Sequence, residues 1–107
     1  MKDKYLTYVG FAIKAGQCAV GTHGALAAVK SRRAAVLLCA EDASERTKEQ
    51  FRRLCREADV PFLPVPPEIR EATGKRDIHL FAICDRHLAD AIMQSLDVTD
   101  LGAGNHE

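Results

Sequence analysis

The chain has 107 residues, 47% of them hydrophobic and 28% charged, and 15 Lys and Arg residues balance 15 Asp and Glu residues. This length is enough for one hydrophobic core and too short for two, and the composition is that of a soluble globular domain. No segment has the length of a membrane span, and Asp3 and Lys14 interrupt the pattern of a signal peptide. We therefore expect a cytoplasmic protein with no membrane partner.

The first part of the sequence predicts two helices and a short strand. Apolar residues recur at three- and four-residue steps over residues 3–15, which favours an amphipathic helix that ends at Gly16. Residues 17–20 are predicted to form a strand. A second helix is predicted over residues 22–31, with the Thr22 hydroxyl as its N-cap.

A buried strand and an amphipathic basic helix are predicted next. Residues 34–40 are continuously apolar, which is typical of a strand buried on both faces. Ser44 is the expected N-cap of a third helix that ends near Ala58. The apolar side of that helix comprises Thr47, Phe51, Leu54, Cys55 and Ala58.

The remaining elements complete an alternating pattern. Residues 60–65 are predicted to form a strand, and Pro64 within it favours an edge position. A short helix follows over residues 67–73, then a turn at 74–77 and a strand over 78–84.

Asp85 is the expected cap of a last helix that ends near Leu96. Because helix and strand alternate throughout, we expect an α/β fold, a three-layer α/β/α sandwich with a small, mixed four-stranded sheet. Residues 1–97 would form a single domain and residues 98–107 a flexible tail.

The four cysteines, Cys18, Cys39, Cys55 and Cys84, are spaced too widely for a Cys-x-x-Cys metal or redox motif. Cys39 and Cys84 lie within apolar runs, and Cys55 lies on an apolar helix face. Buried, reduced thiols are therefore expected, as in a cytosolic protein.

Charge is distributed unevenly along the chain. Residues 1–58 contain 11 Lys and Arg against 6 Asp and Glu, a net charge of +5, whereas residues 59–107 contain 4 against 9, a net charge of −5. Such asymmetry is either a solvated basic face or a surface for RNA or an acidic partner. The basic set is Arg32, Arg33, Arg46, Lys48, Arg52, Arg53 and Arg56.

The start of the second predicted helix is a candidate anion site. Gly21 and Gly24 would let the backbone approach a ligand closely, and free N–H groups at a helix start attract phosphate. His23 and Lys30 share one helix side and could hold a polyanion there. The alternative is an ordinary glycine-containing helix with a solvated His23, and the spacing does not match a Walker or dinucleotide loop.

A catalytic alternative rests on three carboxylates. Glu41, Asp42 and Asp85 each follow a predicted strand and could together hold Mg²⁺, although helix capping is the simpler interpretation. A nucleophilic pair of Cys84 and His87 lacks a third, orienting group. We therefore expect no enzymatic activity, no cofactor and no metal site.

Several segments occur in an order that resembles a known family. They are Lys14-Ala-Gly-Gln, Gly21-Thr22, the block at 34–44, Val60-Pro61-Phe62, and Gly74 before an apolar strand. From about Lys4 to Leu96 the chain resembles the kink-turn-binding ribosomal proteins, large-subunit protein seven-Ae and its relatives. The resemblance implies an α/β/α sandwich whose RNA site combines the start of the second helix with two nearby loops.

The resemblance also implies a set of contact residues, with departures. Gly21 and Thr22 match the family, but His23 stands where Asn is usual, Gly24 where Glu is usual and Ala27 where Lys is usual. These departures remove a hydrogen-bond acceptor for guanine and a contact to phosphate. Ser44 falls in the second contacting loop, and Lys75 and Arg76 fall in the loop before the last strand.

Three hypotheses follow. The first is a non-enzymatic protein that binds structured, kink-turn-like RNA, ribosomal or otherwise, through Gly21, Thr22, His23, Gly24, Lys30, Ser44, Lys75 and Arg76. The second is a protein–protein interaction module that keeps the fold without specific RNA binding. The third is a metal-dependent enzyme.

Overall fold

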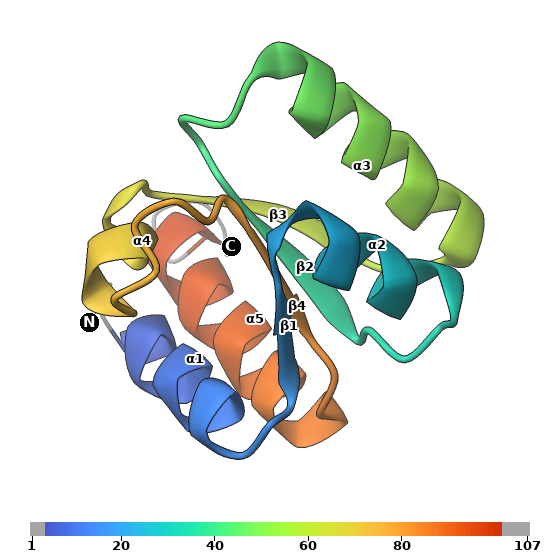
Figure 1. Ribbon diagram of the computed structural model, residues 1–107. Helices are drawn as coiled ribbons and strands as arrows, with labels where there is room; N and C mark the ends of the chain where they lie inside the picture. The colour runs from blue at the N-terminus through green and yellow to red at the C-terminus, as the bar shows by residue number, and fades with distance from the viewer. Residues whose placement is uncertain (1–3, 102–107) are drawn as a thin grey trace.

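The computed structural model describes residues 4–101, and for residues 97–101 it describes the course of the backbone only. Helices and strands alternate along the chain (Figure 1). The elements are α1 (Lys4–Lys14), β1 (Cys18–Val20), α2 (Gly21–Lys30), β2 (Val36–Ala40), α3 (Glu45–Ala58), β3 (Phe62–Val65), α4 (Glu68–Ala72), β4 (Leu80–Ile83) and α5 (Arg86–Leu101).

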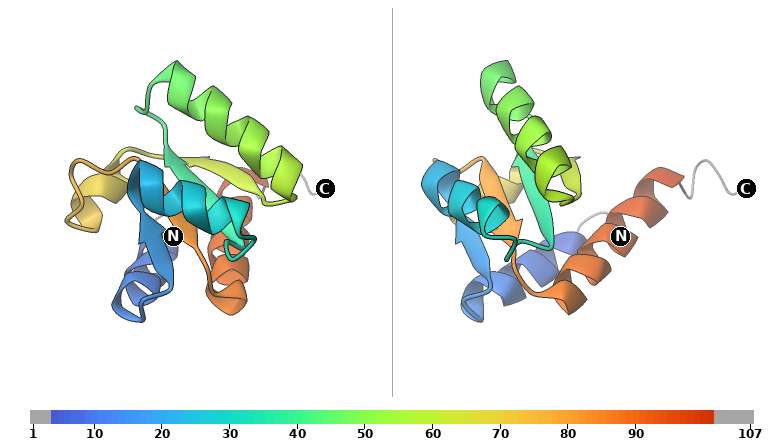
Figure 2. Two further views of the ribbon diagram at one scale, coloured as in Figure 1. Left: turned by 45° about the vertical axis from the view of Figure 1, so that its right-hand side comes forward. Right: turned by 90° about the vertical axis from the view of Figure 1, so that its right-hand side faces the viewer.

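The four strands form one mixed sheet in the order β1-β4-β2-β3. β2 pairs in parallel with β3, whereas β4 is antiparallel to both β1 and β2. Helices α1 and α5 cover one face of the sheet, and α2 and α3 cover the other (Figures 1 and 2). The predicted three-layer α/β/α sandwich with a mixed four-stranded sheet is therefore confirmed.

The central strand β2 is buried on both faces, as its unbroken apolar run predicts. Val36 and Leu38 pack into the cluster beneath α1 and α5, while Leu37 and Cys39 pack beneath α2 and α3. Successive side chains of a strand point to opposite faces, so a strand covered on both sides needs apolar residues at every position. The edge position predicted for the strand with Pro64 is also confirmed, because β3 pairs only with β2.

Helix caps explain where α3 and α5 begin. Ser44 accepts a hydrogen bond from the Thr47 backbone N–H at 3.1 Å, and Asp85 accepts one from the Leu88 N–H at 3.0 Å. Each side chain satisfies a donor that a first helical turn leaves without an intrahelical partner. Both predicted caps are confirmed.

Other boundaries differ from the predictions. Helix α2 begins at Gly21, directly after Val20, so Thr22 lies within the helix and is not its N-cap. β4 begins only at Leu80, which leaves residues 78–79 in a loop. Helix α5 continues to Leu101 instead of ending near Leu96. The rest of the predicted tail, 102–107, lies outside the described residues.

The antiparallel pairing of β2 and β4 rules out the three-carboxylate metal site. Val36 lies opposite Ile83 and Cys39 opposite Leu80, so the end of β2 is beside the start of β4. Glu41 and Asp42 follow β2 at one end of the sheet, whereas Asp85 follows β4 at the other. Over residues 4–96, whose side chains the structure describes, no three His, Cys, Asp or Glu side chains gather closely enough to hold a metal ion.

Within the same span, none of the helices combines the length and the apolar character needed to cross a membrane.

Candidate functional site

The start of α2 is set by the backbone conformation of Gly21. Val20 is still extended, with φ −112° and ψ 152°, and Gly21 follows with φ +84°. A positive φ of this size is readily adopted only by glycine among the common residues. The chain can therefore turn from β1 into α2 without a connecting loop.

No side chain of the described residues caps the first turn of α2. The first N–H groups of a helix lack intrahelical partners and carry the positive end of the helix dipole. Thr22 and His23 are both exposed in this turn. The start of α2 therefore offers backbone donors and two polar side chains to a ligand.

This helix start opens on a hollow of about 270 Å³. The hollow lies where β1 and β2 end and β4 begins, between the start of α2, the β2–α3 loop and the loop before β4. Its lining residues are Gly21, Thr22, Ala43, Ser44, Thr47, Asp77, Ile78, His79 and Leu80. The structure thus brings together three of the predicted site residues, Gly21 and Thr22 from the start of α2 and Ser44 from the β2–α3 loop.

The next residues of α2 lie beside the hollow. His23 is exposed and Gly24 is half-buried. A Cβ atom at Gly24 would come no closer than 3.7 Å to its nearest neighbours, which belong to Ala19. Ala27 is exposed one turn further along the helix. A larger side chain could therefore be accommodated at Gly24, and its absence is not imposed by packing.

Lys30 lies away from the hollow. It is the last residue of α2, and nine helical steps place it about 13 Å from Gly21. With Arg32 and Leu54 it borders a separate groove of about 190 Å³ between the ends of α2 and α3. Any role for Lys30 in ligand binding therefore requires a ligand that runs along α2.

Lys75 and Arg76 stand just before the hollow. They belong to the loop between α4 and β4, immediately before the lining residues 77–80. Arg76 is exposed, and Lys75 is half-buried. Both cations can therefore contribute to the potential at the rim of the hollow without lining it.

The two ionisable lining residues, Asp77 and His79, were not predicted as site residues. Residues 78–84 were predicted to form a strand, which left no reason to assign the side chain of His79 to a site. Because β4 begins at Leu80, His79 instead lies in the loop, and its Nε2 is 3.7 Å from Asp42 Oδ1. The glycine at position 74, with φ +74°, is the sequence signal for this turn.

Part of the predicted basic set is engaged within α3. Lys48 Nζ is 3.2 Å from Glu45, and Arg52 Nη1 is 3.3 Å from Glu49. The Arg52 guanidinium also lies over the Phe62 ring, 5.1 Å from its centroid. Arg46, Arg53 and Arg56 are exposed on the same helix and have no ion pair with a described residue. These three arginines keep their charge available to an outside partner.

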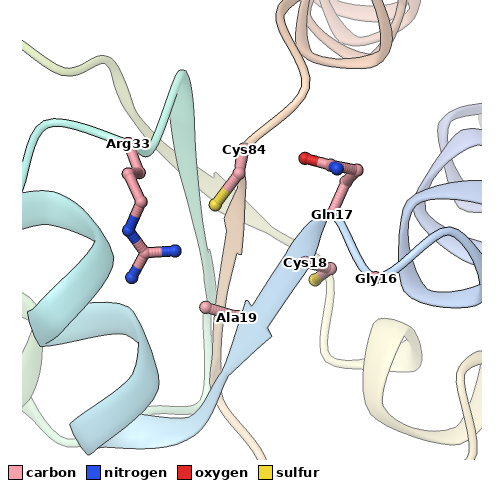
Figure 3. Close-up of a pocket in the computed structure, with 6 residues that line it drawn as sticks. All are labelled: Gly16, Gln17, Cys18, Ala19, Arg33 and Cys84. Carbon is pink, nitrogen blue, oxygen red and sulfur yellow. The ribbon is translucent and has the colours of Figure 1, made fainter.

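A second hollow, of about 430 Å³, lies at the opposite end of β1 (Figure 3). Burial and the nearby Cys84 raise the pKa of the Cys18 thiol to about 12, against a smaller lowering by Lys75. A thiol with that pKa stays protonated at neutral pH and is a poor nucleophile. The remaining lining residues are Gly16, Gln17, Ala19, Arg33 and Cys84.

The structure shows all four cysteines as free thiols, as predicted, but only Cys39 and Cys55 are buried, whereas Cys18 and Cys84 are half-buried. Cys18 packs toward the α1–α5 side of the sheet and Cys84 toward the α2–α3 side, and their sulfur atoms do not point at each other in Figure 3. The Cys84 thiol donates to the Ala82 carbonyl oxygen at 3.8 Å.

Solved structures with the same fold are known. The chain superimposes with a TM-score of 0.81 on a protein of unknown function from Bacillus halodurans C, at 22% identity, covering 88% of this chain and 97% of the other. It superimposes with a TM-score of 0.68 on the Giardia lamblia 15.5kD RNA binding protein, at 18% identity, covering 92% and 84% of the two chains. No curated protein matches the sequence.

A sequence model of a protein family shows which family this chain belongs to. Residues 3–84 match the model of the ribosomal protein L7Ae/L30e/S12e/Gadd45 family. The matched region includes α1 to β4 and every residue that lines the first hollow. The chain therefore belongs to the ribosomal protein L7Ae/L30e/S12e/Gadd45 family.

Proposed function

We propose that this protein is a cytoplasmic, non-enzymatic RNA-binding protein that takes structured RNA, ribosomal or kink-turn-like, at the hollow beside the start of α2. The observation that carries the proposal is the start of α2. The helix begins at a glycine, its N-cap residue makes no side-chain hydrogen bond, and its first residues line a hollow together with Ser44. Family membership supports it, as does the similarity in fold to a protein described as RNA-binding.

The chemistry of the hollow suits a phosphate backbone. Backbone N–H groups at a helix start bind phosphate oxygens, and the hydroxyl of Thr22 can donate to them as well. Lys75 and Arg76 stand at the rim and add long-range attraction. His23, exposed in the first turn, can stack on a base or donate a hydrogen bond to one.

Base specificity is expected to differ from that of kink-turn readers. The family resemblance places a Glu at position 24 and a Lys at position 27, whereas this chain has Gly24 and Ala27. Each lost base contact costs roughly 1–3 kcal/mol of discrimination. The remaining affinity would rest mainly on phosphate contacts and would fall steeply with salt.

Filter binding to a panel of structured RNAs at increasing salt concentration tests the proposal. His23→Ala, and Lys75→Ala combined with Arg76→Ala, should each weaken binding to the preferred RNA. The combined variant should also reduce the slope of log affinity against log salt by about 1.4–1.8, since each phosphate contact contributes about 0.7–0.9. A matched control is Lys14→Ala combined with Arg86→Ala. These two exposed cations are the last residue of α1 and the first residue of α5, at the other end of the sheet.

Equal, weak binding of every RNA, unchanged by the variants at the hollow, would contradict this proposal. A second candidate function, a protein-interaction module, is favoured by one observation, the small residues Gly24 and Ala27 on the accessible side of α2. That function predicts a partner protein that still co-purifies after nuclease treatment and no longer co-purifies with a Gly24→Glu variant.

A further inference from the structure

A single arginine behind the hollow joins three segments of the chain. Arg70 projects from α4, and its Nη2 donates to Asp42 Oδ2 at 2.6 Å. Its Nη1 donates to the backbone carbonyl oxygen of Arg76. The two charged residues are 28 positions apart, so this pair ties together regions that the sequence separates.

Each of the two partners of Arg70 directly precedes a segment that lines the hollow. Asp42 immediately precedes Ala43 and Ser44, which line one wall. Arg76 immediately precedes the second lining segment, 77–80. His79 in that segment also approaches Asp42, with Nε2 3.7 Å from Oδ1. Arg70 therefore adds a side-chain link between these two segments to the backbone hydrogen bond that the Ala40 N–H donates to the His79 carbonyl oxygen at 2.8 Å.

The Arg70 side chain is held by hydrogen bonds within the protein and is not a free cation at the rim of the hollow. Its side chain is 28% exposed, and both terminal nitrogens donate to the protein. Its Nε is shielded from solvent and has no hydrogen-bond partner in the described part of the chain. A planar guanidinium with two fixed partners restrains direction as well as distance.

We propose that Arg70 and Asp42 are positioning residues for RNA, which hold the Ser44 loop and the 75–79 loop at the separation that the ligand requires. This inference rests on the function proposed above. Loops held in the binding geometry before the ligand arrives need not be ordered on binding, so affinity rises without any new contact. Neither Arg70 nor Asp42 lines the hollow itself.

The sign of a charge effect distinguishes positioning from simple electrostatics. Removing a carboxylate near bound phosphates should, by charge alone, tighten RNA binding. The positioning role predicts the opposite for Asp42→Ala, a weakening of about tenfold, because the loops lose their restraint. Asp42→Asn, which loses the same charge but can still accept a hydrogen bond from Arg70, should recover part of the affinity.

Asp77→Ala is the matched control. Asp77 lines the same hollow, is exposed, and has no ion pair with any of the side chains described, those of residues 4–96. Its removal takes a negative charge out of the hollow and should tighten RNA binding. If Asp42→Ala tightens binding as Asp77→Ala does, the positioning role is wrong.

Amide hydrogen exchange of the free protein tests the pair without RNA. In Asp42→Ala the amides of residues 75–79 should exchange several times faster than in the wild type, while those of β2 and α3 keep their rates. Unchanged exchange in this loop would overturn the inference even if RNA binding is established. Faster exchange in a protein that binds no RNA would support the restraint and contradict the proposed function instead. General unfolding of Asp42→Ala would appear as faster exchange in β2 as well. In that case the same measurement is made on Asp42→Asn.

Discussion

The Ser44 side chain accepts a hydrogen bond from the Thr47 backbone N–H at 3.1 Å, while the residue itself lines the hollow beside α2. The same hydroxyl donates to Thr47 Oγ1 at 3.0 Å. Ser44 therefore caps α3 and also lines the candidate site. Two different substitutions at this position can measure its effect on protein stability and its effect on RNA binding.

Ser44→Ala should destabilise the protein by about 1 kcal/mol, because the N-cap acceptor of α3 is lost. Urea unfolding followed by circular dichroism measures this change. Ser44→Asp should keep most of the stability, since a carboxylate also caps a helix and favours its positive end. It should nevertheless weaken RNA binding, because it places a negative charge beside the ligand phosphates. Equal RNA affinity of Ser44→Asp and the wild type would argue against a ligand at this hollow.

Two glycines of α2 should respond oppositely to alanine. Gly21 has φ +84°, so Gly21→Ala should destabilise the protein by about 1–2 kcal/mol through backbone strain. Gly24 has no positive φ, and a Cβ there meets nothing closer than 3.7 Å. Gly24→Ala should therefore stabilise the helix by about 0.5–1 kcal/mol. Thermal unfolding of the two variants makes the comparison, and a destabilising Gly24→Ala would show that the space beside Ala19 is not available.

Gly24→Glu combined with Ala27→Lys should raise affinity for a kink-turn RNA by about tenfold or more. The two substitutions restore the residue types that the family resemblance places at these positions. A Cβ at Gly24 meets nothing closer than 3.7 Å, and Ala27 is exposed. Titration of a kink-turn RNA and of a duplex with the same composition measures selectivity. A matched control is Gly24→Gln combined with Ala27→Lys, which keeps the length of the side chain but cannot offer a carboxylate to guanine. Equal gains for the kink-turn and the duplex would show that only charge had been added.

Stability should fall with rising pH above about pH 9 because of the buried thiols. Burial raises the pKa of Cys55 from 9.0 to about 11, with a further contribution from Cys39. Between these values the unfolded state releases the Cys55 proton while the folded state retains it, so the free energy of unfolding decreases as pH rises. Below the unfolded pKa the effect is fully present and constant. The slope from Cys55 is at most about 1.4 kcal/mol per pH unit.

Urea unfolding at pH 8, 9 and 10 checks this prediction. Lysine and tyrosine also titrate in this range, so the comparison is with Cys55→Ala, whose slope should be shallower than that of the wild type. Parallel slopes for the two proteins would show that the thiol is not the cause.

Short-range patterns predicted much of the fold and one part of the candidate site. The apolar run at 34–40 predicted a strand buried on both faces, and the structure confirms it because β2 lies between two helical layers. Ser44 and Asp85 were predicted as caps and accept the expected hydrogen bonds. Gly21 and Thr22 were placed at a candidate ligand site, and they line the hollow with Ser44. Each of these features depends on residues close together in the chain.

Strand direction and the pairing of distant loops were decided by the tertiary structure. The antiparallel pairing of β4 with β2 separates Asp85 from Glu41 and Asp42, although all three follow a strand in the sequence. Arg70 and Asp42 meet because α4 and the end of β2 pack together, and no local pattern marks either residue as a partner. Local sequence determines which segments become helix or strand through periodicity and capping. Contacts between distant segments depend on how the apolar faces of all the helices and strands are buried together. That arrangement is a property of the whole folded chain.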